Sequence, residues 1–223
     1  SSVGYNLRAV RNAASAVRER LSQEHWHLIG RAQEEFSSAC GRQSRRGELS
    51  AMETLDILRT TGEHMAAITG AQTDRMTRDD GWRLLSIGRH IERLAFLSNA
   101  LLRGVELGSL QSEAGFEAMV ALFDSTITFH AQFQQSREMA ALLDLLVLDR
   151  DNPRSLAWVA HTLRGRLAKL AGSAPQELSE MSLRVPDPKA WKLAELCAFG
   201  DGSLDNSSNV QNLVALRALL RQC

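Results

Sequence analysis

Apolar residues recur along most of this chain at intervals of three and four, the spacing that places them on one face of an α-helix. Residues 79–107 show the pattern most clearly. At about 100° per residue, one broad apolar face of this segment contains Leu84, Ile87, Gly88, Ile91, Leu94 and Ala95. The opposite, wettable face contains Arg83, Ser86, His90 and Arg93. Convincing strand alternation is absent and only four prolines occur, so the pattern predicts an all-α protein.

Capping residues predict where several helices begin. Ser22 is an N-cap candidate, and Ser50 followed by Glu53 forms a capping-box pattern. Asn152 before Pro153 is typical of a helix start, with asparagine as the cap. The expected helices span residues 4–21, 22–41, 79–107, 112–135, 139–148, 152–170 and 209–221, with a further one that opens at Ser50.

The segments between these helices are short and polar, notably residues 41–47 and 200–208, which we expect to be loops. No linker is long enough to force two domains. We therefore expect residues 1–223 to form a single domain, an antiparallel multi-helix bundle.

Composition limits the classes of partner. Lys+Arg and Asp+Glu both number 26, so there is no basic excess of the kind that nucleic acids or anionic membranes attract. We expect neither as a partner. No apolar run approaches the ~20 residues that span a bilayer. The three cysteines, Cys40, Cys197 and Cys223, form no CxxC pair and no disulfide framework, which favours a reducing, cytoplasmic location.

Arg89 and Glu92 are charged residues on a flank of the 79–107 helix that also carries large apolar groups. They lie three positions apart, close enough to pair on the helix surface. Trp82, Leu85 and Phe96 share their flank. A guanidinium and a carboxylate framed in this way would be partly desolvated, which is costly unless the two groups are paired.

Two interpretations of this pair stay open. In the first, Glu92 is mostly buried and accepts bonds from Arg89, Arg93 or an arginine of another helix, so that the pair is structural. In the second, Arg89 offers its planar fork to an external carboxylate or phosphate. Arg154, in the expected first turn of a helix, has the same ambiguity, because positive charge there opposes the helix dipole. The candidate ion-pair or anion site therefore comprises Arg89, Glu92, Arg93, Trp82 and Arg154.

Catalytic and cofactor motifs are not found. Glu24 and His27 have the Glu-x-x-His spacing of di-iron bundles, but that site needs a second copy on another helix, and the sequence has none. There is no phosphate-binding glycine loop and no nucleophile motif. We expect no catalytic residue, no metal and no cofactor in this chain.

Three ordered blocks carry a family resemblance. Gly81-Trp82 with Leu84-Leu85 and Gly88-Arg89-His90-Ile91-Glu92-Arg93 is similar to the second "GR..ER" motif of the Alpha-E domain family, bacterial all-helical proteins named for a Glu-Arg signature. Residues 17–26 (VRERLSQEHW) and 151–156 (DNPRSL) resemble further blocks of that family. An earlier "GR..ERAE"-type helix has no copy here, so the chain resembles the C-terminal two-thirds of the family domain.

The resemblance implies association with circularly permuted ATP-grasp proteins and with transglutaminase-like proteins, either fused to the domain or encoded nearby. It therefore suggests a noncatalytic helical accessory domain that binds an ATP-grasp-type ligase in peptide or amide-bond modification. One alternative is an amide- or peptide-processing enzyme that uses Arg89, Glu92 and Arg93 beside the absent first motif helix. Another is a purely structural module that forms homo-oligomers through exposed apolar positions.

Overall fold

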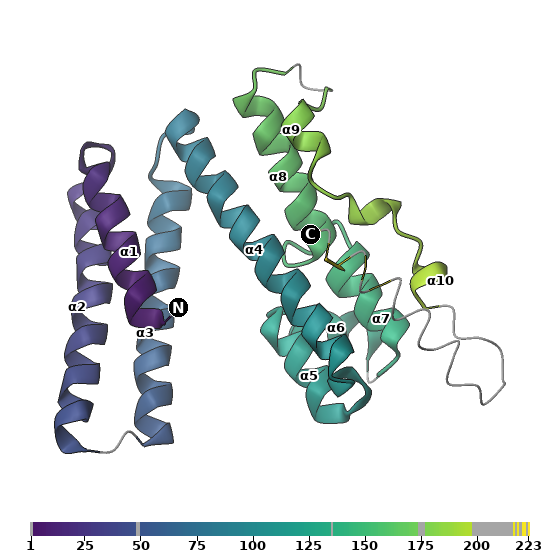
Figure 1. Cartoon of the computed structure of the whole chain (residues 1–223), viewed down its shortest axis with the longest axis horizontal. Coiled ribbons are helices and arrows are strands. Elements are labelled where there is room, and N and C mark those ends of the chain that lie inside the picture. The colour runs from purple at the N-terminus through teal and green to yellow at the C-terminus, as the bar shows by residue number, and fades with distance from the viewer. Residues whose placement is uncertain are drawn as a thin grey trace. The chain divides into compact units, whose positions relative to one another are not determined.

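A computed structural model describes residues 2–47, 50–134, 136–173 and 177–197, together with residues 216, 218, 220, 221 and 223 (Figure 1). All regular structure in these ranges is helical, which confirms the all-α bundle that the pattern predicts. The chain divides into two compact units, Ser1–Trp82 and Arg83–Cys223. The single domain expected over residues 1–223 stays a prediction.

The first unit contains three long helices that run alternately up and down (Figure 1). They are α1 (Val3–Ala16), α2 (Gln23–Arg46) and α3 (Ala51–Asp74), and a 3-10 turn, η1 (Arg18–Arg20), precedes α2. α2 packs against both of the other helices. The apolar stripes meet in a small core of Leu7, Ala14, Ile29, Ala32 and Ile68.

Local capping explains where α2 and α3 begin. The hydroxyl of Ser22 accepts the backbone N–H of His25 at 3.2 Å, and that of Ser50 accepts the N–H of Glu53 at 3.1 Å. Ser50 also donates to the carboxylate of Glu53 at 2.9 Å, so the expected cap at Ser50 is confirmed and Glu53 contacts its hydroxyl.

Two boundaries in this unit differ from the sequence expectation. The predicted loop over residues 41–47 is wrong, because α2 continues to Arg46 and ends at Gly47, whose φ of 90° is left-handed. Polar residues there form a solvated helix face rather than a loop. The first helix is shorter than expected and ends at Ala16, before η1.

The second unit contains most of α4 (Asp80–Glu106), whose first residues belong to the first unit. Its other elements are η2 (Ser109–Gln111), α5 (Glu113–Leu122), α6 (Thr126–Phe133), α7 (Met139–Leu143), a π-helical turn η3 (Asp144–Leu148), α8 (Leu156–Leu170), α9 (Glu180–Leu183), η4 (Pro188–Ala190) and α10 (Leu193–Leu196). The core contains the fully buried residues Leu101, Leu142, Leu146, Val159 and Ala160.

The helix expected over residues 112–135 is broken into α5 and α6, and Gln135 lies outside the described residues. The break follows Leu122, where Asp124 adopts a positive φ of 48° and Ser125 becomes buried. The hydroxyl of Ser125 bonds to the backbone oxygen of Phe123 at 3.0 Å. Asn152, distant in sequence, donates to the same hydroxyl at 3.3 Å and stabilises the break.

The helix cap predicted at Asn152 is wrong. α8 begins three residues later, where the hydroxyl of Ser155 accepts the N–H of Trp158 at 3.0 Å. Both residues are good caps by type. Asn152 is only 5% exposed and bonds to the chain around it instead.

The C-terminal expectations are tested only in part. α8 ends at Leu170, just before Gly172 with its φ of 70°, as the sequence predicted. The loop expected over residues 200–208 and most of the helix expected over 209–221 lie outside the described residues. In the part of the chain that is described, no helix has the length and hydropathy needed to cross a membrane.

Candidate functional site

Arg89 lies half-buried on α4, one helical turn before the exposed Arg93. Burial lowers the pKa of Arg89, and the positive charge of Arg93 lowers it further. Neither arginine makes an ion pair with a residue that the structure describes. The two guanidinium groups therefore repel each other and have no carboxylate partner in the described chain.

The first interpretation expected Glu92 to be mostly buried and paired with an arginine, and the structure contradicts that burial. Glu92 is exposed, and it contacts no arginine among the described residues at hydrogen-bond distance. The reason lies in the surface around Glu92, where Phe96 of the same flank is 56% exposed. Because this surface stays solvated, nothing forces the carboxylate to find a partner.

We expect Glu92→Ala to leave the melting temperature of the chain unchanged within experimental error, because an exposed side chain without a partner contributes little. Leu94→Ala is the contrasting variant, since Leu94 is 3% exposed. Circular dichroism melts of both variants provide the measurement. A large drop in the melting temperature of Glu92→Ala would instead support the structural ion pair.

His90 lies beside the two arginines and is held by two contacts. Its Nδ1–H donates to the backbone oxygen of Ser86 at 2.6 Å, and its ring stacks on Trp158 of α8 with centroids 6.0 Å apart. Because a carbonyl oxygen only accepts, the proton of the neutral ring lies on Nδ1.

The pKa of His90 depends on burial, on one hydrogen bond and on the charges of three arginines. Burial is the main cause that lowers the pKa of His90. The positive charges of Arg166, Arg93 and Arg89 lower the same pKa further, whereas the bond to Ser86 raises it. We call Arg89, His90, Arg93 and Arg166 the α4 basic cluster.

The α4 basic cluster can stabilise negative charge supplied from outside the unit. Guanidinium groups present planar donors that match carboxylate and phosphate oxygens, and partial burial strengthens such bonds. Sequence reasoning found Arg89 and Arg93 but missed Arg166, which belongs to α8. No local signal could have found it, because the approach of α8 to α4 depends on the tertiary fold.

Trp82 has a structural role in the first unit. It is 7% exposed, and its indole N–H donates to the backbone oxygen of Gln72 at 3.0 Å. Its backbone N–H donates to Asp79 at 3.0 Å, and the guanidinium of Arg78 lies 4.1 Å from its ring centroid. Trp82 belongs to the first unit, whereas the α4 basic cluster belongs to the second.

Arg154 lies at the surface, in the turn before α8, where it pairs with Asp124 at 2.5 Å. The two side chains are 45% and 80% exposed. Exposed pairs of this kind contribute little to stability. Arg154 is therefore neither in the first helical turn nor part of the cluster on α4.

An ion pair is present elsewhere in the motif blocks, and both of its side chains are exposed. Arg20 of η1 pairs with Asp79, which also accepts the backbone N–H of Trp82 at the start of α4. That backbone bond and the Arg20 guanidinium lower the pKa of Asp79. A Cβ atom on Gly81 would lie 2.8 Å from Nη2 of Arg20, so glycine leaves the guanidinium its space. The pair joins the 17–26 block to the Gly81-Trp82 block.

His25 lines the same cavity as Arg20 and Asp79. It is 3% exposed, its Nε2 has no hydrogen-bond partner among the described residues, and burial lowers its pKa. It lines this cavity of about 250 Å³ together with Glu19, Arg20, Ser22, Ala71, Arg75, Met76, Thr77 and Asp79. The ring is therefore a neutral group that the fold keeps from protonation.

We expect this ring to make the chain sensitive to acid. In the unfolded chain His25 takes up a proton near its ordinary pKa of 6.5, whereas in the folded chain its pKa is lower. The contribution of neutral His25 to folding stability is therefore fully present above that pH and is lost as the pH falls. Melting temperatures between pH 8 and pH 5.5 should fall less for His25→Leu than for the parent chain. His161→Gln, at an exposed histidine, is the control. If the melting temperatures of the parent and of His25→Leu fell equally with pH, His25 would not be the source of the acid sensitivity.

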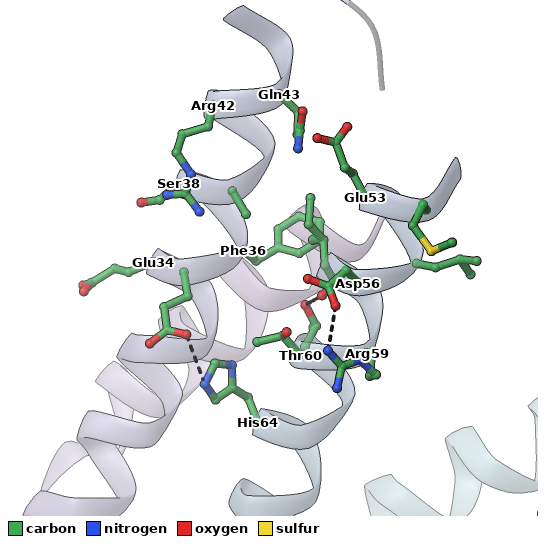
Figure 2. Close-up of a pocket in the computed structure, with 16 residues that line it drawn as sticks. Glu34, Phe36, Ser38, Arg42, Gln43, Glu53, Asp56, Arg59, Thr60 and His64 are labelled. Carbon is green, nitrogen blue, oxygen red and sulfur yellow. Dashed lines mark hydrogen bonds and ion pairs between the residues drawn. The ribbon is translucent and has the colours of Figure 1, made fainter. Parts of the chain in front are cut away.

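A separate groove of about 870 Å³ lies between α2 and α3 (Figure 2). Its carboxylates have partners, because Asp56 accepts from Arg59 at 2.6 Å and Glu35 pairs with His64 at 3.4 Å. The side-chain oxygen of Gln43 is buried there, and no residue that the structure describes bonds to it. None of the candidate site residues lies in this groove.

Comparison with known proteins gives one family and a small set of relatives. The Alpha-E family model, described as a predicted alpha-helical domain with a conserved ER motif, matches residues 1–208. Uncharacterized protein Rv2567 of Mycobacterium tuberculosis is 28% identical over 196 residues, which cover 84% of this chain and 22% of that protein. Uncharacterized protein Mb2597 of Mycobacterium bovis has the same identity and coverage. No solved structure matches the chain.

The chain thus spans about a fifth of the length of these curated relatives, 22% in each case. It contains two Glu-Arg pairs, Glu19-Arg20 and Glu92-Arg93. The arginine of the first pair binds Asp79, and the arginine of the second lies in the α4 basic cluster.

Proposed function

The chain belongs to the Alpha-E family, and from this membership we propose that it is a noncatalytic helical accessory domain of an ATP-grasp-type ligase. In this role the domain binds the ligase, or is fused to it, and the ligase performs the chemistry of peptide or amide-bond modification. Transglutaminase-like proteins are the second class of partner that the family resemblance implies.

The length of the relatives is the observation that carries this proposal. The matched region is 22% of each of the two mycobacterial proteins, so in them it is one part of a much longer chain. A helical segment in that setting works together with the regions around it. The α4 basic cluster adds a second support, because it offers positive charge that the described residues do not neutralise at Arg89 and Arg93.

The enzyme alternative at Arg89, Glu92 and Arg93 is not favoured. A general base at Glu92 would have to be held by a neighbour that positions it. Glu92 is instead exposed and contacts none of the described arginines. The geometry of these three residues therefore offers no positioned acid-base pair.

We expect the isolated chain to bind ATP no more tightly than millimolar, which corresponds to about 4 kcal/mol of binding free energy. ATP sites combine phosphate-binding amides, cations and carboxylates that hold Mg²⁺, and we assign that machinery to the ligase. Calorimetry with Mg-ATP measures this directly. Micromolar binding to the chain alone would contradict the accessory role.

The partner is tested by affinity purification of the full-length protein from its native host, followed by mass spectrometry. An ATP-grasp-type protein should copurify, or should form part of the same polypeptide. The proposal is supported if this protein is recovered in an amount comparable to that of the purified chain at low salt concentration. If no such protein is present and the chain elutes as a homo-oligomer, the structural-module alternative replaces the proposal.

A further inference from the structure

The arginines of the second unit differ in whether they have a carboxylate partner. Partners are present in the ion pairs Arg103–Glu106, Arg137–Glu113, Arg150–Asp187, Arg164–Asp187, Arg154–Asp124, Arg184–Glu180 and Arg221–Glu106. Arg89 and Arg93 have none among the described residues. Even exposed arginines of this unit thus have carboxylate partners. The half-buried Arg89, which lies next to a second positive charge, has none among the described residues.

This arrangement is unfavourable in the empty site. Like charges one helical turn apart destabilise a helix, and partial burial removes the water that would screen them. On α8, Trp158 and Arg166 are eight residues apart, so they lie on one face of that helix. Because Trp158 stacks on His90, this face of α8 is turned toward α4 at the same place. Positive groups therefore converge from two helices.

We propose that the α4 basic cluster is a binding site for a phosphate-type dianion, bound by the guanidinium groups of Arg89 and Arg93 with Arg166 and His90 beside them. A dianion fits better than a single carboxylate, which would neutralise only one of the two charges on α4. Because the neutral ring of His90 donates its Nδ1–H to the Ser86 carbonyl, its Nε2 can only accept a hydrogen bond, as from the O–H of a hydrogen phosphate dianion. The proposal concerns the ligand of this site and does not depend on which ligase the domain accompanies.

The experiment compares phosphate binding by the whole chain with binding by charge variants. Arg89→Gln and Arg93→Gln each remove one guanidinium of the proposed site. Arg103→Gln is the matched control, because Arg103 lies on the same helix, is 76% exposed and pairs with Glu106. Thermal melts and calorimetry in Hepes, with inorganic phosphate titrated at constant ionic strength, give the readout.

Phosphate should stabilise the parent chain and the Arg103→Gln variant alike. Loss of one charge-assisted contact should weaken phosphate binding roughly ten-fold in Arg89→Gln and in Arg93→Gln. Without phosphate, Arg89→Gln should melt at the same temperature as the parent or higher, because it relieves the repulsion from Arg93. A merely structural Arg89 would show the opposite, a lower melting temperature with and without phosphate.

Three results would overturn the proposal: no stabilisation of the parent chain by phosphate, an equal effect from acetate at the same ionic strength, or an equal loss of binding in Arg103→Gln. If Arg89→Gln does not fold, Arg93→Gln decides, since Arg93 is exposed and its replacement removes no packing. These results leave the accessory role untouched. That role is contradicted by other observations, namely micromolar ATP binding to the chain or the absence of a ligase partner.

Discussion

Replacing Trp82 with alanine should lower the free energy of unfolding by about 3–5 kcal/mol, the usual cost of removing a buried large aromatic side chain. Trp82 is 7% exposed and fills the space between the end of α3 and the start of α4. The variant also leaves the backbone oxygen of Gln72 without the indole donor that lies 3.0 Å away. Urea unfolding followed by far-UV circular dichroism measures the change.

Trp82→Phe separates the two contributions. Phenylalanine keeps most of the apolar surface but cannot donate to Gln72, so its loss should be smaller and close to that of one unsatisfied buried acceptor, about 1–3 kcal/mol. An unfolding curve for Trp82→Ala that overlays the parent would show that the ring is not part of the folded interior.

Asn152→Ala should destabilise the second unit by about 1–3 kcal/mol, because it removes buried hydrogen bonds without replacing them. The side-chain amide of Asn152 donates to the backbone oxygen of Leu145 at 3.2 Å and to Ser125 at 3.3 Å. Its oxygen accepts the N–H of Arg154 at 3.1 Å. One side chain thereby connects the π-helical turn, the α5–α6 break and the turn before α8.

Asn152→Asp is the informative companion to this variant. It preserves size and the acceptor for Arg154 but places an oxygen against the oxygen of Leu145, so it should be at least as harmful as alanine. Arg154→Ala, two positions away at the surface, is the matched control and should have little effect. Comparable losses for Arg154→Ala and Asn152→Ala would rule out the buried network as the cause.

Features set by neighbouring residues were predictable from the sequence. The caps at Ser22 and Ser50 depend on a hydroxyl and an amide three residues apart, and both form as expected. The helix over residues 79–107 follows from apolar spacing and is observed as Asp80–Glu106.

Features that depend on distant parts of the chain were not predictable in this way. Asn152 and Ser155 are equally good caps by type, and Asn152 loses that role because Ser125, far away in sequence, holds it in the interior. Likewise, spacing brings Arg89 and Glu92 within reach, but whether they pair depends on which flank of α4 is covered. The surface around Glu92 stays exposed, and the approach of α8 supplies Arg166 rather than a carboxylate.

The contrast between Asp79 and His25 sets the order in which acid acts on the first unit. His25 begins to oppose folding below its ordinary pKa of 6.5, whereas the carboxylate of Asp79, with its pKa lowered from 3.8, remains ionised far below that point. In mild acid the protonation of His25 should therefore destabilise the folded unit while the Arg20–Asp79 pair is still formed. The first species to accumulate on acidification should be one whose helix ends remain joined at this pair around an opened interior.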